Sequence, residues 1–137
     1  MFLVGPRAIV VDASAGGDAV GAIDGWDLRV EGWLKAQVQL HAPPGFPYEM
    51  ANALLLSRRQ PLATVRAQLR ALDGLEIAIA DDRAMDLLEC ASLAAQHGLT
   101  VYDAAYLQLA LFLEAELATR DRALARAARA EGLVVHD

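Results

Sequence analysis

The sequence predicts an α/β fold in which helices cover both faces of a central, mostly parallel β-sheet. Two observations lead to this prediction. Short segments rich in β-branched residues alternate with longer helical patterns along the whole chain, and parallel strands need crossover connections of that kind. The length of 137 residues is also typical of one domain, which we place at residues 1–137.

The first part of the chain predicts a strand, a loop, a helix and a second strand. Residues 7–12 form an apolar, β-branched run that ends in Asp12. Residues 13–17 predict a loop beside that carboxylate, and the glycine-rich composition of residues 15–21 predicts that it is mobile. Residues 24–37 have helical periodicity that places their two tryptophans on one packed face, and residues 38–42 have the composition of a strand.

The middle of the chain predicts two helices and a third strand. A proline-rich turn ends the second strand, and residues 48–56 then form a strong helical segment with Glu49 near its start. Residues 61–72 predict another helix, which Asp73-Gly74 ends. Residues 75–79 are apolar and predict the third strand.

The last part of the chain repeats the alternation of helix and strand. We expect a long helix over residues 81–97, capped by Gly98. The next helix is nearly apolar all round, which predicts burial or a subunit contact. The remaining predicted elements are helices over residues 100–113 and 122–130 and strands over residues 117–119 and 132–135.

Charge and composition restrict the function. The formal net charge of -6 argues against a broad basic surface that binds nucleic acid through its phosphates alone. The single cysteine, Cys90, can form no internal disulfide and suits a small core residue in a reducing, cytoplasmic setting. No apolar run reaches the ~20 residues of a membrane span, and no export signal is evident, so we expect a cytoplasmic protein without a membrane segment.

Four acidic residues fall where α/β folds place their ligand sites. In an open parallel sheet that site lies beyond the carboxyl ends of the strands. Asp12 ends the first strand, Asp121 follows a later one by two residues, and Glu49 and Asp103 stand at the starts of helices after loops. We therefore expect these four carboxylates to converge on one edge.

Crowded carboxylates repel one another, and a hard divalent cation such as Mg²⁺ or Mn²⁺ offsets that repulsion. The spacing of histidine and cysteine fits no structural zinc site. A cation held by carboxylates alone keeps positions open for phosphate oxygens, as phosphodiester hydrolysis requires. The sequence alone leaves open whether one or two ions act.

Four motifs carry a resemblance to a known family. They are Val10-Val11-Asp12-Ala13-Ser14, Tyr48-Glu49-Met50-Ala51-Asn52, Gly98-Leu99-Thr100-Val101-Tyr102-Asp103-Ala104-Ala105-Tyr106 and Leu117-Ala118-Thr119-Arg120-Asp121. The chain resembles the PIN-domain family over essentially its whole length, in particular the VapC-type toxins of toxin–antitoxin pairs. The last two motifs, at this spacing, are the most specific.

The resemblance implies a three-layer α/β/α sandwich, a Mg²⁺- or Mn²⁺-dependent ribonuclease, a homodimer and inhibition by a cognate antitoxin protein. It places catalysis and metal binding on Asp12, Glu49, Asp103 and Asp121. Asn52 and Thr119 match polar positions beside this tetrad, and Ser14 is a further candidate; we expect supporting roles for all three. Asp103 or Glu49 is the candidate general base.

Each acid also has a structural explanation, because carboxylates cap helices and favour their N-terminal turns. We assign only a capping role to Asp81 and Asp82, and we expect Asp18, Asp24 and Asp27 to face water. A basic stripe at helical spacing is by default solvated surface, although with Arg58 and Arg59 it also suits RNA phosphates or the antitoxin. The stripe consists of Arg122, Arg126 and Arg129.

Other functions compete with a nuclease. A PIN-like module that binds RNA or a partner with weak or no catalysis has the same fold. A phosphoacceptor receiver domain needs a lysine late in the chain, whereas the only lysine is Lys35. Dinucleotide-binding and P-loop enzymes are disfavoured because their glycine-rich motifs are missing.

Overall fold

The computed structural model describes residues 6–137, and its central feature is a five-stranded sheet with the strand order β3-β2-β1-β4-β5. Every neighbouring pair of strands runs parallel, which confirms the predicted parallel sheet. The strands are β1 (Ala8–Val11), β2 (Gln39–Ala42), β3 (Ala78–Ile79), β4 (Glu116–Ala118) and β5 (Val135–His136).

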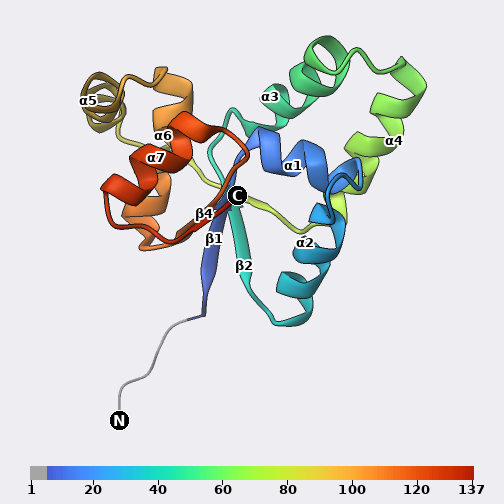
Figure 1. The fold of residues 1–137 in the computed structure, drawn as a ribbon, viewed down its shortest axis with the longest axis horizontal. Coiled ribbons are helices and arrows are strands. Elements are labelled where there is room, and N and C mark those ends of the chain that lie inside the picture. The colour runs from blue at the N-terminus through green and yellow to red at the C-terminus, as the bar shows by residue number, and fades with distance from the viewer. Residues whose placement is uncertain (1–5) are drawn as a thin grey trace.

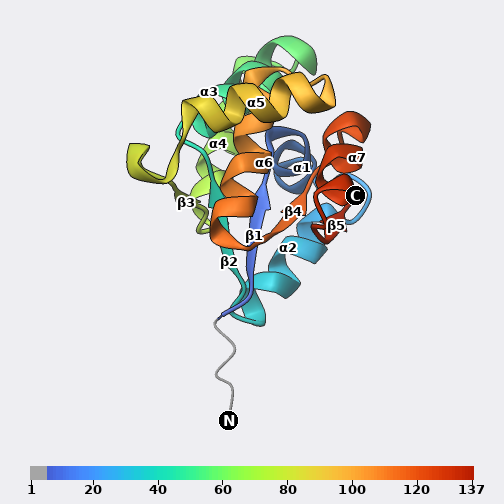
Figure 2. The same ribbon diagram turned by 90° about the vertical axis from the view of Figure 1, so that its left-hand side faces the viewer.

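Helices cover both faces of the sheet and complete three layers (Figures 1 and 2). On one side lie α1 to α4, and on the other lie α5 to α7. The helices are α1 (Ala13–Val20), α2 (Trp26–Lys35), α3 (Phe46–Asn52), α4 (Leu62–Asp73), α5 (Leu87–His97), α6 (Val101–Leu113) and α7 (Arg122–Ala130). A π-helical turn, η1 (Ala53–Ser57), continues α3, and a short 3₁₀ helix, η2 (Asp82–Ala84), precedes α5.

The alternating side chains of β1 divide the core between the two faces. Ile9 and Val11 belong to the cluster that contains Trp26 of α2. Val10 belongs to the other cluster, which contains Leu107 of α6 and Leu124 of α7. This two-sided burial is what a central strand of a parallel sheet requires. The expected packing of the tryptophans is also present, since the rings of Trp26 and Trp33 meet edge to face at 6.2 Å.

The prediction of a mobile loop after Asp12 was wrong, because α1 begins at the next residue. Asp12 caps this helix by accepting a hydrogen bond from the backbone N–H of Ala15. The glycines serve close packing instead of flexibility. A Cβ added to Gly16 would lie 3.0 Å from Sδ of Met50 and 3.1 Å from Cζ of Phe46, so α3 approaches α1 where only glycine fits.

The predicted helix over residues 81–97 starts later than expected. Asp81 caps only η2, by accepting from the N–H of Arg83, and Met85 is extended with φ -102° and ψ 131°. Asp86 then caps α5 by accepting from the N–H of Glu89. Gly98 ends α5 with φ +66°, as predicted.

Two other features agree with the sequence analysis. Cys90 is buried in α5. Six of the residues between positions 104 and 110 of α6 are also buried, as its apolar composition predicts. Within residues 6–137, none of the helices combines the length and hydropathy needed to cross a bilayer.

Candidate active site

The four predicted carboxylates lie on segments that meet at the carboxyl ends of β1 and β4. Asp12 follows β1, and its backbone N–H donates to the carbonyl oxygen of Ala118 at the end of β4. Asp121 is the N-cap of α7, three residues after the end of β4. Glu49 and Asp103 lie in the first turns of α3 and α6.

Asp12 is the most buried of the four, with 5% of its surface exposed. Its Oδ1 accepts from the Ser14 hydroxyl at 2.6 Å and from the N–H of Ala15 at 2.9 Å, and its Oδ2 accepts from the Thr119 hydroxyl. The pKa of Asp12 is raised to about 6, because burial and, to a smaller extent, the charge of Asp121 outweigh the lowering effect of these hydrogen bonds.

Ser14 and Thr119 join Asp12 to the loop between β4 and α7. The Thr119 side-chain oxygen accepts from the N–H of Asp121 at 3.0 Å, and the Ser14 oxygen accepts from the N–H of Arg120 at 2.8 Å. Thr119 is fully buried. These two hydroxyls therefore orient Asp12 and also fix the backbone that carries Asp121.

Glu49 has a partner that the sequence analysis did not single out. The buried Tyr106 hydroxyl donates to Oε2 of Glu49 at 2.5 Å. Burial raises the pKa of Glu49, the hydrogen bond from Tyr106 lowers it, and the charge of Asp103 raises it. The available signal was spacing, because Tyr106 follows Asp103 by three residues and so shares its helix face.

Asp103 completes an electrostatically connected set. Its pKa is raised by burial and by the charge of Asp121, and its own charge raises the pKa of Glu49. Burial, the hydrogen bond to Glu49 and the charges of Glu49, Asp12 and Asp103 all raise the pKa of the Tyr106 hydroxyl. All four carboxylates thus interact with one another directly or through a shared neighbour.

The donor set suits a hard cation, but its side chains are not arranged around one. Among residues 6–137, no three His, Cys, Asp or Glu side chains are placed to hold a single metal ion. Asp12 is turned toward its hydroxyl donors and Glu49 toward Tyr106. The oxygen ligands fit Mg²⁺ or Mn²⁺ in kind, so cation binding requires Glu49 or Asp103 to rotate toward the fixed carboxylate of Asp12.

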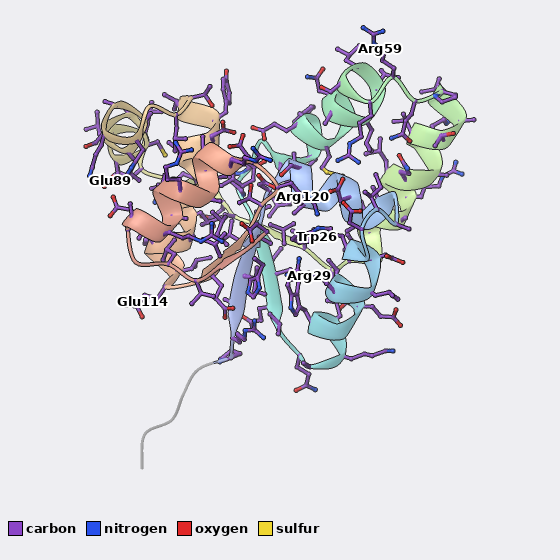
Figure 3. The ribbon with its side chains drawn as sticks, viewed as in Figure 1. Trp26, Arg29, Arg59, Glu89, Glu114 and Arg120 are labelled. Carbon is purple, nitrogen blue, oxygen red and sulfur yellow. The ribbon has the colours of Figure 1, made fainter. Side chains whose placement is uncertain are left out.

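The other predicted site residues have different surroundings. Asn52 is exposed one turn after Glu49, and its side chain makes no hydrogen bond within the described part of the chain. Arg122 and Arg126 are exposed on α7. Arg59 is exposed near the end of η1 and lies well apart from Arg120 (Figure 3).

The expectation that Asp18 faces water was wrong. It is 7% exposed, and it forms ion pairs with Arg58 at 2.7 Å and with Arg120 at 3.4 Å. Arg120 also pairs with the exposed Asp24 and lies 5.9 Å from the ring centre of Trp26. The sequence placed Asp18 in a loop, and a loop gives no reason to bury a carboxylate.

Comparisons with known proteins agree with this architecture. The sequence matches the PIN domain family over residues 9–130. The crystal structure of PAE2754 from Pyrobaculum aerophilum is similar with a TM-score of 0.73 and 26% identity, covering 94% of this chain and 83% of that one. The structure of FitAcB from Neisseria gonorrhoeae has a TM-score of 0.55 and 20% identity over 94% of this chain and 96% of that one.

The chain therefore belongs to the PIN domain family. Members of this family are generally nucleases. No curated protein sequence matches the chain significantly.

Proposed function

We propose that this protein is a Mg²⁺- or Mn²⁺-dependent endoribonuclease, and that Asp12, Glu49, Asp103 and Asp121 hold the cation. The observation that carries the proposal is the connected set of carboxylates at the carboxyl edge of the sheet, with Asp12 buried among donors that fix its orientation. Burying mutually repelling carboxylates is costly, and a divalent cation offsets that cost.

The chain's own residues have distinct tasks in this proposal. A bound cation supplies activation of water and neutralisation of charge on the phosphate. Ser14 and Thr119 hold Asp12 in one orientation. Glu49 or Asp103 accepts the proton of the attacking water, and the raised pKa of each brings it closer to neutral pH, where a general base works best.

The exposed residues and the sequence motifs support a substrate and two kinds of partner. The exposed Arg122 and Arg126 lie on the helix that Asp121 caps, so they can bind RNA phosphates beside the site. The likeness of the motifs to VapC-type toxins supports a cytoplasmic toxin held inactive by an antitoxin protein. A homodimer suits the exposed apolar residues of α5 and α6, Leu87, Leu88 and Phe112.

A second function is favoured by one observation. Because no three acidic side chains of residues 6–137 are preassembled around a cation, a PIN-fold module that binds RNA or a partner with little or no catalysis also accounts for the site. The two functions differ in whether metal binding leads to cleavage.

The decisive test is cleavage of a mixed RNA pool by purified protein in Mg²⁺ or Mn²⁺. We expect cutting that EDTA and Asp12→Asn both abolish, while Asp82→Asn, at an exposed acid outside the site, retains it. Metal binding without cutting would favour the binding module. Cutting that survives in EDTA or in Asp12→Asn would contradict the assignment of this site.

A further inference from the structure

Asp18 is a buried carboxylate outside the tetrad, and two arginines compensate its charge. Its side chain is 10% exposed and contacts Nη2 of Arg58 at 2.7 Å and Nε of Arg120 at 3.4 Å. A buried charge without partners is strongly unfavourable. The buried charge of Asp18 therefore depends on its ion pairs with Arg58 and Arg120.

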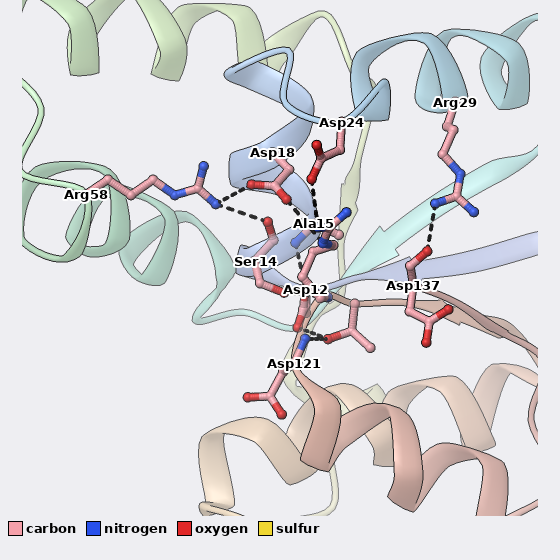
Figure 4. A network of polar contacts seen from close by, with 11 residues as sticks. Asp12, Ser14, Ala15, Asp18, Asp24, Arg29, Arg58, Asp121 and Asp137 are labelled. Atoms are coloured by element: carbon pink, nitrogen blue, oxygen red, sulfur yellow. Dashed lines mark hydrogen bonds and ion pairs between the residues drawn. The ribbon is translucent and has the colours of Figure 1, made fainter.

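Both arginines also contact Ser14, which binds Asp12. Figure 4 shows Arg58 pointing toward Asp18 and Ser14. Nη2 of Arg58 donates to the carbonyl oxygen of Ser14 at 3.3 Å, and the backbone N–H of Arg120 donates to the Ser14 hydroxyl oxygen at 2.8 Å. That hydroxyl donates in turn to Oδ1 of Asp12 at 2.6 Å. A continuous path of polar contacts thus leads from Asp18 to Asp12.

The same contacts join three segments that carry tetrad residues. Asp18 and Ser14 belong to α1, which Asp12 caps. Arg58 follows the π-helical turn that continues α3, the helix of Glu49, and its N–H is fixed to the carbonyl of Ala53 at 2.8 Å. Arg120 directly precedes Asp121. Asp18 is the point at which these segments meet.

Gly17 leaves the space that Arg58 occupies. A Cβ at this position would lie 2.7 Å from Nη2 and 2.9 Å from Cζ of Arg58. The obstructed atoms are the end of a flexible side chain, so a larger residue would displace the guanidinium while the backbone stays in place. Substitution of Gly17 therefore tests the Asp18–Arg58 contact without changing either charged residue.

We propose that Asp18 is a positioning residue that, through Arg58 and Arg120, sets the relative placement of the carboxylates and thereby the affinity of the site for a divalent cation. This inference rests on the proposed metal site, but not on RNA being the substrate. Partners that orient metal ligands typically change metal affinity by about 10- to 100-fold when they are removed. Because Asp18 acts through further residues, we expect a change of about tenfold.

The test is calorimetric binding of Mn²⁺ to the full chain, carried out on Gly17→Ala and the matched control Gly32→Ala. Gly32 also lies within a helix, but a Cβ there meets nothing within 4 Å. Alanine favours helix at both positions, so Gly32→Ala should melt no lower than the wild type. Gly17→Ala should lose some stability, because it displaces Arg58 from the buried Asp18. We expect Gly17→Ala alone to weaken Mn²⁺ binding about tenfold.

A double-mutant cycle separates positioning from a general loss of structure. If Gly17→Ala acts by displacing Arg58, then Arg58→Gln has a similar effect and the double variant binds Mn²⁺ no more weakly than either single variant. Asp18→Asn should weaken binding in the same way. Mn²⁺ affinities of Gly17→Ala and Asp18→Asn within twofold of wild type would overturn the inference.

The Mn²⁺ titration, combined with the RNA cleavage assay, distinguishes the role of Asp18 from the proposed ribonuclease activity. Wild-type protein that binds Mn²⁺ and shows the expected loss in the variants, yet cuts no RNA, would retain the role of Asp18 and reject the ribonuclease. Wild-type protein that binds no Mn²⁺ would overturn both.

Discussion

At Asp12, stability and the proposed function oppose each other. The carboxylate is 5% exposed, and burial raises its pKa from 3.8 to about 6. Between these values the folded protein holds a proton that the unfolded chain has lost. The stabilisation that comes from this retained proton is therefore complete below about pH 4 and is lost as the pH rises through about 6.

Asp12→Asn should consequently stabilise the metal-free protein at pH 7.5 but not at pH 4. A pKa of about 6 in place of 3.8 corresponds to at most about 3 kcal/mol of stability. Urea unfolding in EDTA at both pH values measures the free energy of unfolding. Suppose instead that the variant is less stable than wild type at pH 7.5, or that its free energy of unfolding changes equally at both pH values. Burial of the ionised Asp12 carboxylate would then not be the main destabilising effect.

Tyr106→Phe tests the hydrogen bond to Glu49. The Tyr106 hydroxyl lowers the pKa of Glu49, so its removal raises that pKa. The acid limb of the cleavage profile should then move to higher pH, and stability should fall by about 1 kcal/mol. Tyr102→Phe is the matched control, because Tyr102 is a 75% exposed tyrosine on the same helix. An unchanged acid limb in Tyr106→Phe would mean that ionised Glu49 is not required.

Individual residues also show how far the sequence could predict the site. Asp12, Glu49, Asp103 and Asp121 were predicted because strand ends and helix starts fix their positions without knowledge of packing. Asp18 could not be predicted, since its burial depends on Arg58, forty residues away. Tyr106 was quoted within a motif, but its role appears only when α3 and α6 are placed together.

At the scale of elements, packing overrides local preference in two places. Gly16 and Gly17 disfavour a helix in isolation, yet α1 forms because Asp12 caps it and because α3 and Arg58 occupy the space that side chains would fill. The π-helical turn after α3 has an ordinary sequence, Ala-Leu-Leu-Leu-Ser, that gives no local signal for it. Both features lie beside the site, where π-helical turns are often found.

The start of α5 provides an element-scale prediction. Two aspartates at positions 81 and 82 suggested an early start, whereas Asp86 accepts the capping hydrogen bond from Glu89. Asp86→Ala should therefore destabilise the protein by about 1 kcal/mol, and Asp82→Ala should have little effect. Chemical denaturation of the two variants compares them directly. Equal losses, or a larger loss for Asp82→Ala, would contradict this boundary.

At the scale of the molecule, alternation of strands and helices was enough to predict the parallel sheet and its three layers. The strand order β3-β2-β1-β4-β5 depends on which strands pair across long distances, and local patterns do not encode it. The convergence of the acids was nevertheless predictable, because parallel strands all end at the same edge.

The overall charge of -6 makes local basic patches important for RNA binding. In an Asp12→Asn background that does not cut, Arg122→Gln with Arg126→Gln should weaken RNA binding and reduce its salt slope by about 1 per arginine. Arg66→Gln with Arg70→Gln is the control, because these exposed arginines have the same spacing on α4. Fluorescence anisotropy over a KCl series measures both. Equal effects of the two pairs would indicate nonspecific attraction.

The central claim is that the four carboxylates form one cation site, and anomalous diffraction from crystals grown with Mn²⁺ tests it most directly. We expect an anomalous peak about 2 Å from carboxylate oxygens of Asp12 and at least one other member of the tetrad, with Glu49 or Asp103 rotated toward it. A saturating Mn²⁺ concentration that gives no peak at this edge of the sheet, or a peak held by other residues, would contradict the account.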